Sequence, residues 1–350
     1  MRILMVVPEG PDRNPFVPSL MEGLARCGHE VHSGLDRFWD SFDAYDLLFF
    51  QWPESIFDWK KNRMDLERLS GHLDRIRQSG VKTVITCHNL YPHNHDPQTM
   101  ALYELVYSRM DAFHHMGRYS YDLFREKYPA CHHFIAPHHV ADSLWRAPVN
   151  SADAKSSLGI PSRNTVVAAF GAFRNSGETW LFTRMANSIL RRDISFLAPR
   201  MPEARMDGGS LKKRLKSLYK KWAFQRIRLK RADFLTDEEL GRWLSASDIV
   251  FIQRKEILNS GNVPLAFAAG KAVVGPDLGN VGEVLRETGN FVFNPDDGGS
   301  VRRAVRRAID EVRNGNRLGA ENHRYAKENW TTSVVCKKIE EELLNICGKI

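Results

Sequence analysis

The chain alternates short apolar runs with segments of helical periodicity over most of its length. In the first half, apolar runs are followed by amphipathic stretches, such as the one at 66–80 that ends at Gly80. Strands that are apolar on both faces are typical of a parallel sheet covered by helices on both sides. The pattern therefore predicts a doubly wound parallel sheet. Its expected strands are 2–7, 30–34, 46–52, 83–88, 112–116 and 133–138, with helices at 17–28, 66–80 and 100–110.

The pattern restarts after a polar stretch at 147–164. The second set has strands at 165–171, 193–199, 248–253, 271–276 and 290–295, helices at 178–192 and 264–270, a short strand and a helix within 231–248, and two C-terminal helices. A chain of 350 residues has room for two domains at roughly 150 residues each. We therefore predict an α/β protein of two Rossmann-like domains joined near residue 150. Ligands of such sheets bind beyond the carboxyl ends of the strands, so the expected site is the cleft between the domains.

Composition narrows the class of protein. Hydrophobic residues make up 43% and charged residues 26%, which excludes a disordered chain, a collagen-like repeat and a small disulfide scaffold. The five cysteines are scattered without a CxxC pair, as expected of reduced thiols. The N-terminus lacks a signal-peptide pattern, and no run of 18 apolar residues occurs, so we expect a cytoplasmic protein. The net charge of +8 favours anionic partners.

Phosphate-binding motifs are absent where they are usually found. Neither GxGxxG nor GxxxxGK[ST] occurs, which disfavours a dinucleotide dehydrogenase and a P-loop NTPase. The best candidate phosphate site is the stretch 258–277, where Asn259, Ser260 and Gly261 lead into an expected helix. Free N–H groups at that helix start could bind a diphosphate, although the same residues also make a plain helix cap.

The segment 248–285 carries a resemblance to a known family. It resembles the donor-binding segment of GT-B glycosyltransferases, most closely the bacterial exopolysaccharide and capsule enzymes related to the large retaining family that includes sucrose synthase. Related strings occur in the same order in the first half of the chain. They are NPF (14–16), FFQWPES (49–55), TCHNLYPHN (86–94), AFHHMGRYS (112–120) and FIAPHH (134–139).

The resemblance implies a domain plan and an activity. An acceptor-binding domain at 1–150 would precede a donor-binding domain at 151–330, with a final helix at 331–350 packing back on the first domain. The implied enzyme moves a sugar from a nucleotide-diphosphate sugar (UDP or GDP) to a saccharide or polyprenyl-diphosphate-linked saccharide, in cell-surface or exopolysaccharide synthesis. The resemblance also implies that the enzyme is a hexosyltransferase that needs neither a metal nor another cofactor.

The donor diphosphate would lie against a cationic loop and the expected helix start. The residues expected there are Arg174, Ser260, Gly261, Asn262, Arg254 and Lys255. The family usually places two glutamates around this helix start, the second of which holds the ribose. Here Leu265 stands at the second position and the first falls near Ile257, beside Glu256. The resemblance favours retention of anomeric configuration, and the missing glutamates leave inversion open.

The first half supplies the candidate acceptor and catalytic residues. His88 and Asn89 follow an expected strand, as do Trp52 and Glu54, an aromatic–carboxylate combination that suits a sugar. Asn14 follows the first strand and could hydrogen-bond the acceptor; plain packing is the alternative for each of these residues. An inverting reaction requires a base, for which we nominate His88 first and Asp96 second.

A metal site is disfavoured on spacing. His93, His95 and Asp96 lie close together in the sequence, and three adjacent pairs occur at 114–115, 132–133 and 138–139. Neighbouring residues of a strand point to opposite faces, so each pair offers at most one ligand to a site.

A basic run at 211–231 contains no acidic residue. Leu211, Leu215, Leu218 and Trp222 fall at helical spacing within it. The run is either a solvated helix face or a surface that docks on an anionic membrane leaflet, which would make the protein peripheral on the inner face of the membrane. It matches no nucleic-acid motif, so we expect no nucleic-acid partner. For the whole chain, the alternative to an enzyme is a non-catalytic nucleotide- or carbohydrate-binding protein on a degenerate GT-B fold.

Overall fold

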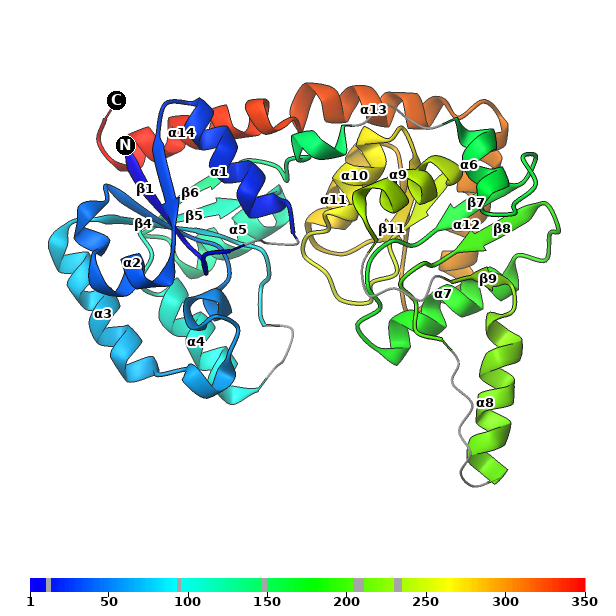
Figure 1. Cartoon of the computed structure of the whole chain (residues 1–350), viewed down its shortest axis with the longest axis horizontal. Helices are drawn as coiled ribbons and strands as arrows, with labels where there is room; N and C mark the ends of the chain where they lie inside the picture. The colour runs from blue at the N-terminus through cyan, green and yellow to red at the C-terminus, as the bar shows by residue number, and fades with distance from the viewer. Residues whose placement is uncertain (11–13, 93–95, 146–149, 204–210, 230–234, 350) are drawn as a thin grey trace. The chain divides into compact units, whose positions relative to one another are not determined.

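The computed structural model describes residues 1–10, 14–92, 96–145, 150–203, 211–229 and 235–349 (Figure 1). The chain divides into two compact units. Unit 1 comprises Met1–Asp142 together with Glu328–Ile350, and unit 2 comprises Ser143–Lys327. The change of unit thus falls at residue 142, within the expected first domain. No helix among the described residues is long and apolar enough to cross a membrane.

Unit 1 is built on a six-stranded sheet in which every neighbouring pair is parallel. The order across the sheet is β2-β1-β3-β4-β5-β6. Each strand is short and apolar, and each expected strand of this half is confirmed to within a few residues. The strands are β1 (Arg2–Val6), β2 (Glu30–Ser33), β3 (Leu47–Phe50), β4 (Lys82–Thr86), β5 (Ala112–His115) and β6 (His132–Ile135).

Helices cover both faces of this sheet because its side chains alternate between two cores. Leu48 and Phe50 enter a core with α2 (Leu35–Asp40), α3 (Leu66–Ser79), α4 (Pro97–Tyr107) and α5 (Arg118–Lys127). Leu47 and Phe49 enter the opposite core with α1 (Phe16–Arg26) and α14 (Thr332–Ile346). The last helix of the chain, α14, therefore lies beside the first, α1, as Figure 1 shows.

Unit 2 repeats the architecture with a different strand order. Its sheet is also wholly parallel, in the order β12-β11-β10-β7-β8-β9. The strands are β7 (Thr165–Ala168), β8 (Ile194–Leu197), β9 (Ile227–Arg228), β10 (Ile249–Phe251), β11 (Ala272–Pro276) and β12 (Phe291–Phe293). One large apolar core lies between this sheet and helices α7 (Ser176–Ser188) and α12 (Gly298–Arg313). The predicted α/β class, with two doubly wound parallel sheets, is therefore confirmed.

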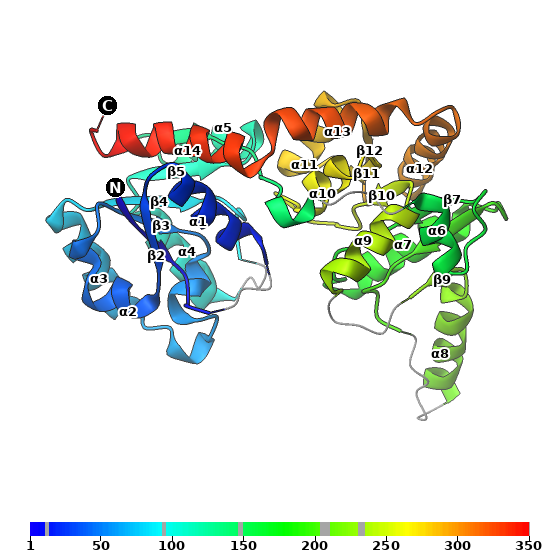
Figure 2. The ribbon, with the colours of Figure 1, turned by 45° about the horizontal axis from the view of Figure 1, so that its top comes forward.

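Three details of the second half differ from the sequence prediction. The polar stretch at 147–164 contains a helix, α6 (Ser151–Ser157), whose first N–H groups are capped by the Asn150 side chain. The short strand is β9, which precedes the predicted segment; residues 230–234 lie outside the described residues. The C-terminal part forms three helices, α12, α13 (Arg317–Asn329) and α14, because Gly315 and Asn316 adopt positive φ between the first two. Figure 2 shows this tight turn.

The remaining helices of unit 2 are α8 (Leu211–Phe224), α9 (Asp237–Ala246), α10 (Asn262–Ala268) and α11 (Gly279–Glu287). Of these, α10 and α11 lie beside β11 and follow the strand ends where the candidate donor residues lie. Helix α8 differs from these helices, because it extends away from the body of unit 2 in both Figure 1 and Figure 2.

Candidate functional site

The strand order of unit 2 places a topological switch point between β7 and β10. The chain leaves β7 toward β8 on one side and leaves β10 toward β11 on the other. The two outgoing loops therefore diverge, and such a point at the carboxyl edge of a parallel sheet is where ligands bind in doubly wound folds. The loops concerned are 169–175 and 252–261, which contain five of the six predicted donor residues.

The backbone at Gly171 is where side chains of these loops meet. Gln253 Nε2 donates to the Gly171 carbonyl oxygen at 2.7 Å. A Cβ added at Gly171 would lie 2.9 Å from both Arg254 Nη2 and Asn262 Nδ2. A side chain at this position would therefore displace the ends of the Arg254 and Asn262 side chains. The fold brings Arg254 and Asn262, two predicted donor residues, to the end of β7.

A buried ion pair holds this arrangement together. Arg254 Nη1 donates to Glu178 Oε2 at 2.5 Å and to the Ala172 carbonyl oxygen at 2.7 Å. Arg254 and Glu178 are 8% and 2% exposed. The same Glu178 oxygen accepts the backbone N–H of Arg174 at 2.8 Å, so one carboxylate shapes the loop that carries Arg174. Breaking a buried pair of this kind leaves an uncompensated charge, which is strongly destabilising.

The Arg174 side chain itself is exposed at this edge of the sheet. Partial desolvation and the like charge of Arg254 lower its pKa, while Glu178 opposes that effect. Two guanidinium groups thus lie within electrostatic reach of each other, with one carboxylate between them. A bound anion would relieve their repulsion, and the planar fork of arginine suits phosphate oxygens.

The other predicted donor residues have partners within the protein. The Ser260 hydroxyl oxygen accepts the N–H of Asn262, the first residue of α10, at 3.3 Å, while the residue at the N-cap position is Gly261. Gly261 directly precedes α10, a helix of seven residues. Lys255 Nζ lies 2.8 Å from Asp296 Oδ1 in an exposed ion pair. Leu265, at the position of the family's second glutamate, is buried in α10.

Three residues of this loop cluster, Gly171, Gln253 and Glu178, were missed by sequence reasoning. Gly171 lies three residues after the end of β7 and Gln253 two residues after the end of β10, which was an available signal. Glu178 had no local signal, because its partner Arg254 is 76 residues away in the chain.

Unit 1 has its own switch point between β1 and β3, where His88, Gln51 and Trp52 come together. His88 Nε2 is 2.9 Å from Gln51 Oε1, and the His88 ring stacks on Trp52 with centroids 4.0 Å apart. Gln51 Nε2 in turn donates to Met5 Sδ, which orients its oxygen toward the imidazole. This pattern assigns the proton of neutral His88 to Nε2 and leaves Nδ1 as the basic nitrogen.

Burial keeps His88 neutral. Desolvation, and after it the neighbouring His138, His114 and His139, lowers the pKa of His88 well below its ordinary value. The same shift lowers the proton affinity of the ring, so neutral His88 is better suited to orienting an acceptor hydroxyl by a hydrogen bond than to removing its proton.

Glu54 and Asn89 join the same edge through two tyrosines of α4. Tyr103 Oη donates to Glu54 Oε2 at 3.0 Å, and burial raises the pKa of Glu54. Tyr107 Oη donates to the Asn89 carbonyl oxygen at 2.9 Å. The predicted residues Glu54, Asn89, Trp52 and His88 therefore belong to adjoining strand ends.

Two further predicted residues act in local structure. The Asn14 side chain accepts the N–H of Phe16 at 3.2 Å, just ahead of α1. Asp96 caps α4 by accepting from Thr99 N and Oγ1, and it pairs with Lys61. These partners lower the pKa of Asp96 to about 2, so its proton affinity is poor for a general base at neutral pH.

Most histidines of the adjacent pairs form side-chain hydrogen bonds, whereas both ring nitrogens of His139 are buried without a hydrogen-bond partner. His114 lies between Thr86 Oγ1 and the Ala136 carbonyl oxygen, while His115 contacts Ser120 Oγ and His133. His93 and His95 lie outside the described residues. In the part of the chain that is described, no group of three or more His, Cys, Asp or Glu residues could hold a metal ion.

No protein-family model matches the sequence, and a search of curated proteins finds no relative. Solved structures do match. Sucrose-phosphate synthase from Thermosynechococcus elongatus is 15% identical, with all of both chains covered and a TM-score of 0.75. Anabaena Alr3699/HepE, solved with UDP, is 13% identical over 99% of this chain and 100% of its own, with a TM-score of 0.73.

A third match is the catalytic domain of starch synthase IV from Arabidopsis thaliana, bound to ADP and acarbose. It is 11% identical over 99% of each chain, with a TM-score of 0.68. At these identities the likeness shows the fold. The chain has the two-unit GT-B fold over its whole length, as the motifs of its sequence led us to expect.

Proposed function

We propose that this protein is a glycosyltransferase that uses a nucleotide-diphosphate sugar as donor. The observation that carries the proposal is the convergence of Arg174, Arg254 and Asn262 around Gly171 at the switch point of unit 2. Structures with the same fold were solved with UDP, UDP-glucose and ADP, which supports a nucleoside diphosphate as the ligand of this edge.

Arg174 has the central role in the proposed donor site. Its exposed guanidinium would bind the diphosphate and stabilise the charge that develops as the nucleotide leaves. Arg254 contributes positive charge from a fixed position, because Glu178 and Ala172 hold its Nη1. The backbone N–H groups of Ser260 and Gly261 would add donors, since those of Asn262 and Val263 already donate to Ser260. Cationic side chains supply this charge without a metal, so we expect transfer to continue in the presence of EDTA.

Unit 1 would bind the acceptor, for which we propose a saccharide or a polyprenyl-diphosphate-linked saccharide in cell-surface or exopolysaccharide synthesis. Trp52 offers an aromatic face, and Glu54 offers a carboxylate already polarised by Tyr103. Neutral His88 would orient the acceptor hydroxyl through Nδ1. We propose transfer of a hexose with retention of anomeric configuration, which product NMR would establish. An inverted product would instead make His88 the general base.

Nucleotide binding is the first test of this proposal. We expect UDP, GDP or ADP at millimolar concentration to raise the unfolding midpoint of the purified protein, because a ligand that binds only the folded state stabilises it by mass action. CMP, which lacks the second phosphate, should shift the midpoint less. Arg174→Ala should weaken binding of the diphosphate about tenfold in calorimetry, since it removes a charge-assisted contact.

Arg306→Ala is the matched control, because Arg306 is an exposed arginine on α12 of the same unit. It should leave the affinity unchanged. If no nucleotide diphosphate shifts the midpoint, the proposed donor site is wrong. Tight binding without transfer of any sugar would favour the alternative, a non-catalytic nucleotide- or carbohydrate-binding protein. The buried Leu265 at the ribose-binding position is the feature that favours this alternative.

A further inference from the structure

Helix α8 (Leu211–Phe224) exposes an apolar stripe to solvent. Leu215, Leu218, Tyr219 and Trp222 are 57%, 51%, 56% and 60% exposed. Their spacing of three, four and seven residues places them along one side of the helix. On an ordinary surface helix this side would be buried against the core. Here it faces water, along a helix that extends away from unit 2 (Figure 1).

The opposite side of α8 holds the helix to the body of unit 2. Ser217, Ala223 and Phe224 are buried, and Phe224 packs edge-on against Trp180 of α7. Asn187 Nδ2 donates to the Ala223 carbonyl oxygen at 3.0 Å. The side of α8 that meets unit 2 is thus already occupied, so the exposed stripe is not a core face in a displaced position.

Two aromatic rings of the stripe are stacked in a short series. Tyr219 lies between Trp180 and Trp222, with centroid distances of 5.7 Å and 5.9 Å and interplanar angles of 25° and 28°. The stack supports Tyr219 and Trp222 while leaving more than half of each exposed. An ordered and exposed Trp–Tyr pair is typical of a surface that meets the boundary between water and lipid.

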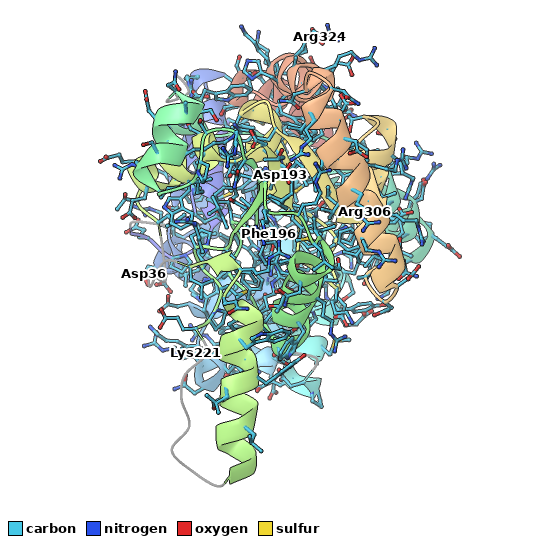
Figure 3. The ribbon with its side chains drawn as sticks, turned by 90° about the vertical axis from the view of Figure 1, so that its right-hand side faces the viewer. Asp36, Asp193, Phe196, Lys221, Arg306 and Arg324 are labelled. Atoms are coloured by element: carbon cyan, nitrogen blue, oxygen red, sulfur yellow. The ribbon has the colours of Figure 1, made fainter. Side chains whose placement is uncertain are left out.

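The charge around this stripe has one sign. The segment 211–229 contains eight Lys and Arg residues and no Asp or Glu. Among the residues whose side chains are described, Lys221 is exposed beside Trp222, and Figure 3 shows it on α8. The last two residues of the predicted basic run, 230 and 231, lie outside the described residues. The segment therefore combines exposed apolar side chains with a sequence rich in Lys and Arg.

We propose that α8 docks unit 2 onto the surface of an anionic phospholipid bilayer, with the stripe of Leu215, Leu218, Tyr219 and Trp222 in the interface and the basic residues on the headgroups. An interfacial helix is recognised by an apolar face flanked by Lys and Arg. Its binding to a membrane increases with the apolar area that it buries and with its attraction to anionic lipids. The helix has 14 residues and lies in the plane of the membrane without crossing it. This inference does not depend on the proposed glycosyl transfer.

Vesicle sedimentation of the full-length protein tests the proposal. We expect several-fold stronger binding to phosphatidylcholine vesicles that contain about a third phosphatidylglycerol than to pure phosphatidylcholine, and weaker binding at 0.5 M salt because screening shortens the electrostatic range. Leu218→Ser/Trp222→Ser should reduce binding to the anionic vesicles about tenfold. Lys220→Glu/Lys221→Glu should reduce it at least as much.

Two control variants distinguish binding through α8 from a general effect of positive charge or of exposed apolar side chains. Arg302→Glu/Arg306→Glu makes the same charge change on α12, whose apolar side chains are buried or half-buried; Figure 3 labels Arg306 on this helix. Leu190→Ser removes a leucine that is 86% exposed elsewhere in unit 2. Both should retain at least half of the wild-type binding.

Equal binding by the two vesicle types would overturn the proposal, as would an equal loss in the α8 and α12 charge variants. A protein that fails to bind either vesicle and self-associates through α8 would show that a second copy covers the stripe. Sedimentation velocity of wild type and Leu218→Ser/Trp222→Ser would detect that outcome. Unchanged circular dichroism and melting of the variants would establish that they fold, since all four substituted positions on α8 lie outside the buried side of the helix.

Discussion

Several buried histidines of unit 1 have pKa values far below that of a histidine in water. Burial lowers the pKa of His114 and His138 to about 4, of His139 to about 3 and of His115 to about 2. His88 shifts in the same direction. All five are therefore neutral at pH 7, and they form hydrogen bonds and ring contacts at the edge of the sheet that carries the proposed acceptor residues.

Because these histidines are neutral in the folded protein, we expect the free energy of unfolding to fall in mild acid. In the unfolded chain each histidine binds a proton near pH 6.5, whereas in the folded protein it does so only near pH 4 or below. Between these two pH values the unfolded state binds more protons than the folded state. The contribution of these histidines to the free energy of unfolding is therefore complete above pH 6.5 and is lost as the pH falls toward 4. We expect the free energy of unfolding to drop by at least about 3 kcal/mol between pH 7 and pH 5, measured in urea.

A substitution tests whether the dependence of the free energy of unfolding on pH comes from these histidines. His114→Gln keeps a donor for the Ala136 carbonyl oxygen and should reduce the proton uptake on unfolding at pH 5 by about one. A wild-type stability that is flat from pH 7 to pH 5 would show that these histidines are not buried in their neutral form.

At the scale of elements, the closest approach in unit 1 joins α1 to α14 at Gly23. A Cβ added there would lie 2.2 Å from Cys336 Sγ and 2.8 Å from Thr332 Cγ2. Ser19 and Thr332 hydroxyls hydrogen-bond nearby at 3.1 Å. The glycine lets two helices from opposite ends of the chain pack with their backbones close together, and so it fixes α14 on the sheet.

Two glycine substitutions with opposite effects check this packing. Gly23→Ala should destabilise the protein by about 1–3 kcal/mol, because the new methyl group overlaps a buried sulfur. Gly71→Ala, in the middle of α3 with nothing within 4 Å of the new Cβ, should stabilise it by about 0.5–1 kcal/mol through helix propensity alone. Urea unfolding gives both values. If Gly23→Ala were as stabilising as Gly71→Ala, the contact of α1 with α14 would be looser than described.

At the scale of the whole molecule, the two units differ in which parts of the chain form them. Unit 2 is one continuous segment, Ser143–Lys327, with its own core. Unit 1 needs residues from both ends of the chain, since Val335, Cys336, Ile339 and Leu343 of α14 are fully buried in its second core. The last helix is therefore part of the first unit's core.

Fragments should reflect this difference. We expect the 143–327 fragment to unfold cooperatively by itself, and the 1–142 fragment to lack a cooperative transition because one core is left open. Adding the peptide 328–350 should restore the transition in circular dichroism. Truncation after Cys347 should be tolerated, because it spares α14 and removes an exposed Lys349–Asp46 pair together with the hydrogen bonds that the Gly348 and Lys349 N–H groups donate to the last turn of the helix. A cooperative 1–142 fragment as stable as the full chain would contradict this account of the core.

The pattern of apolar and polar residues by itself predicted the strands of the two sheets except β9, because periodicity is a local property. It also placed His88, Trp52, Arg174 and Arg254 just beyond strand ends. It did not indicate the helices α2, α5 and α6. Two local signals in the sequence were overlooked, namely Asn150 as the cap of a helix in the apparent linker and Gly315 and Asn316 as the break between the last helices, although Asn is typical of a helix start and Gly-Asn of a helix end.

Only the tertiary structure decided the strand order, and with it the switch points where these loops diverge. The same is true of the Glu178–Arg254 pair and of the Asp96–Lys61 pair, which turned a candidate base into a carboxylate of low proton affinity. The solvent exposure of the α8 stripe was likewise settled by what packs on its other side. Each of these depends on contacts between distant residues, which form only when the whole sheet and its helices are assembled.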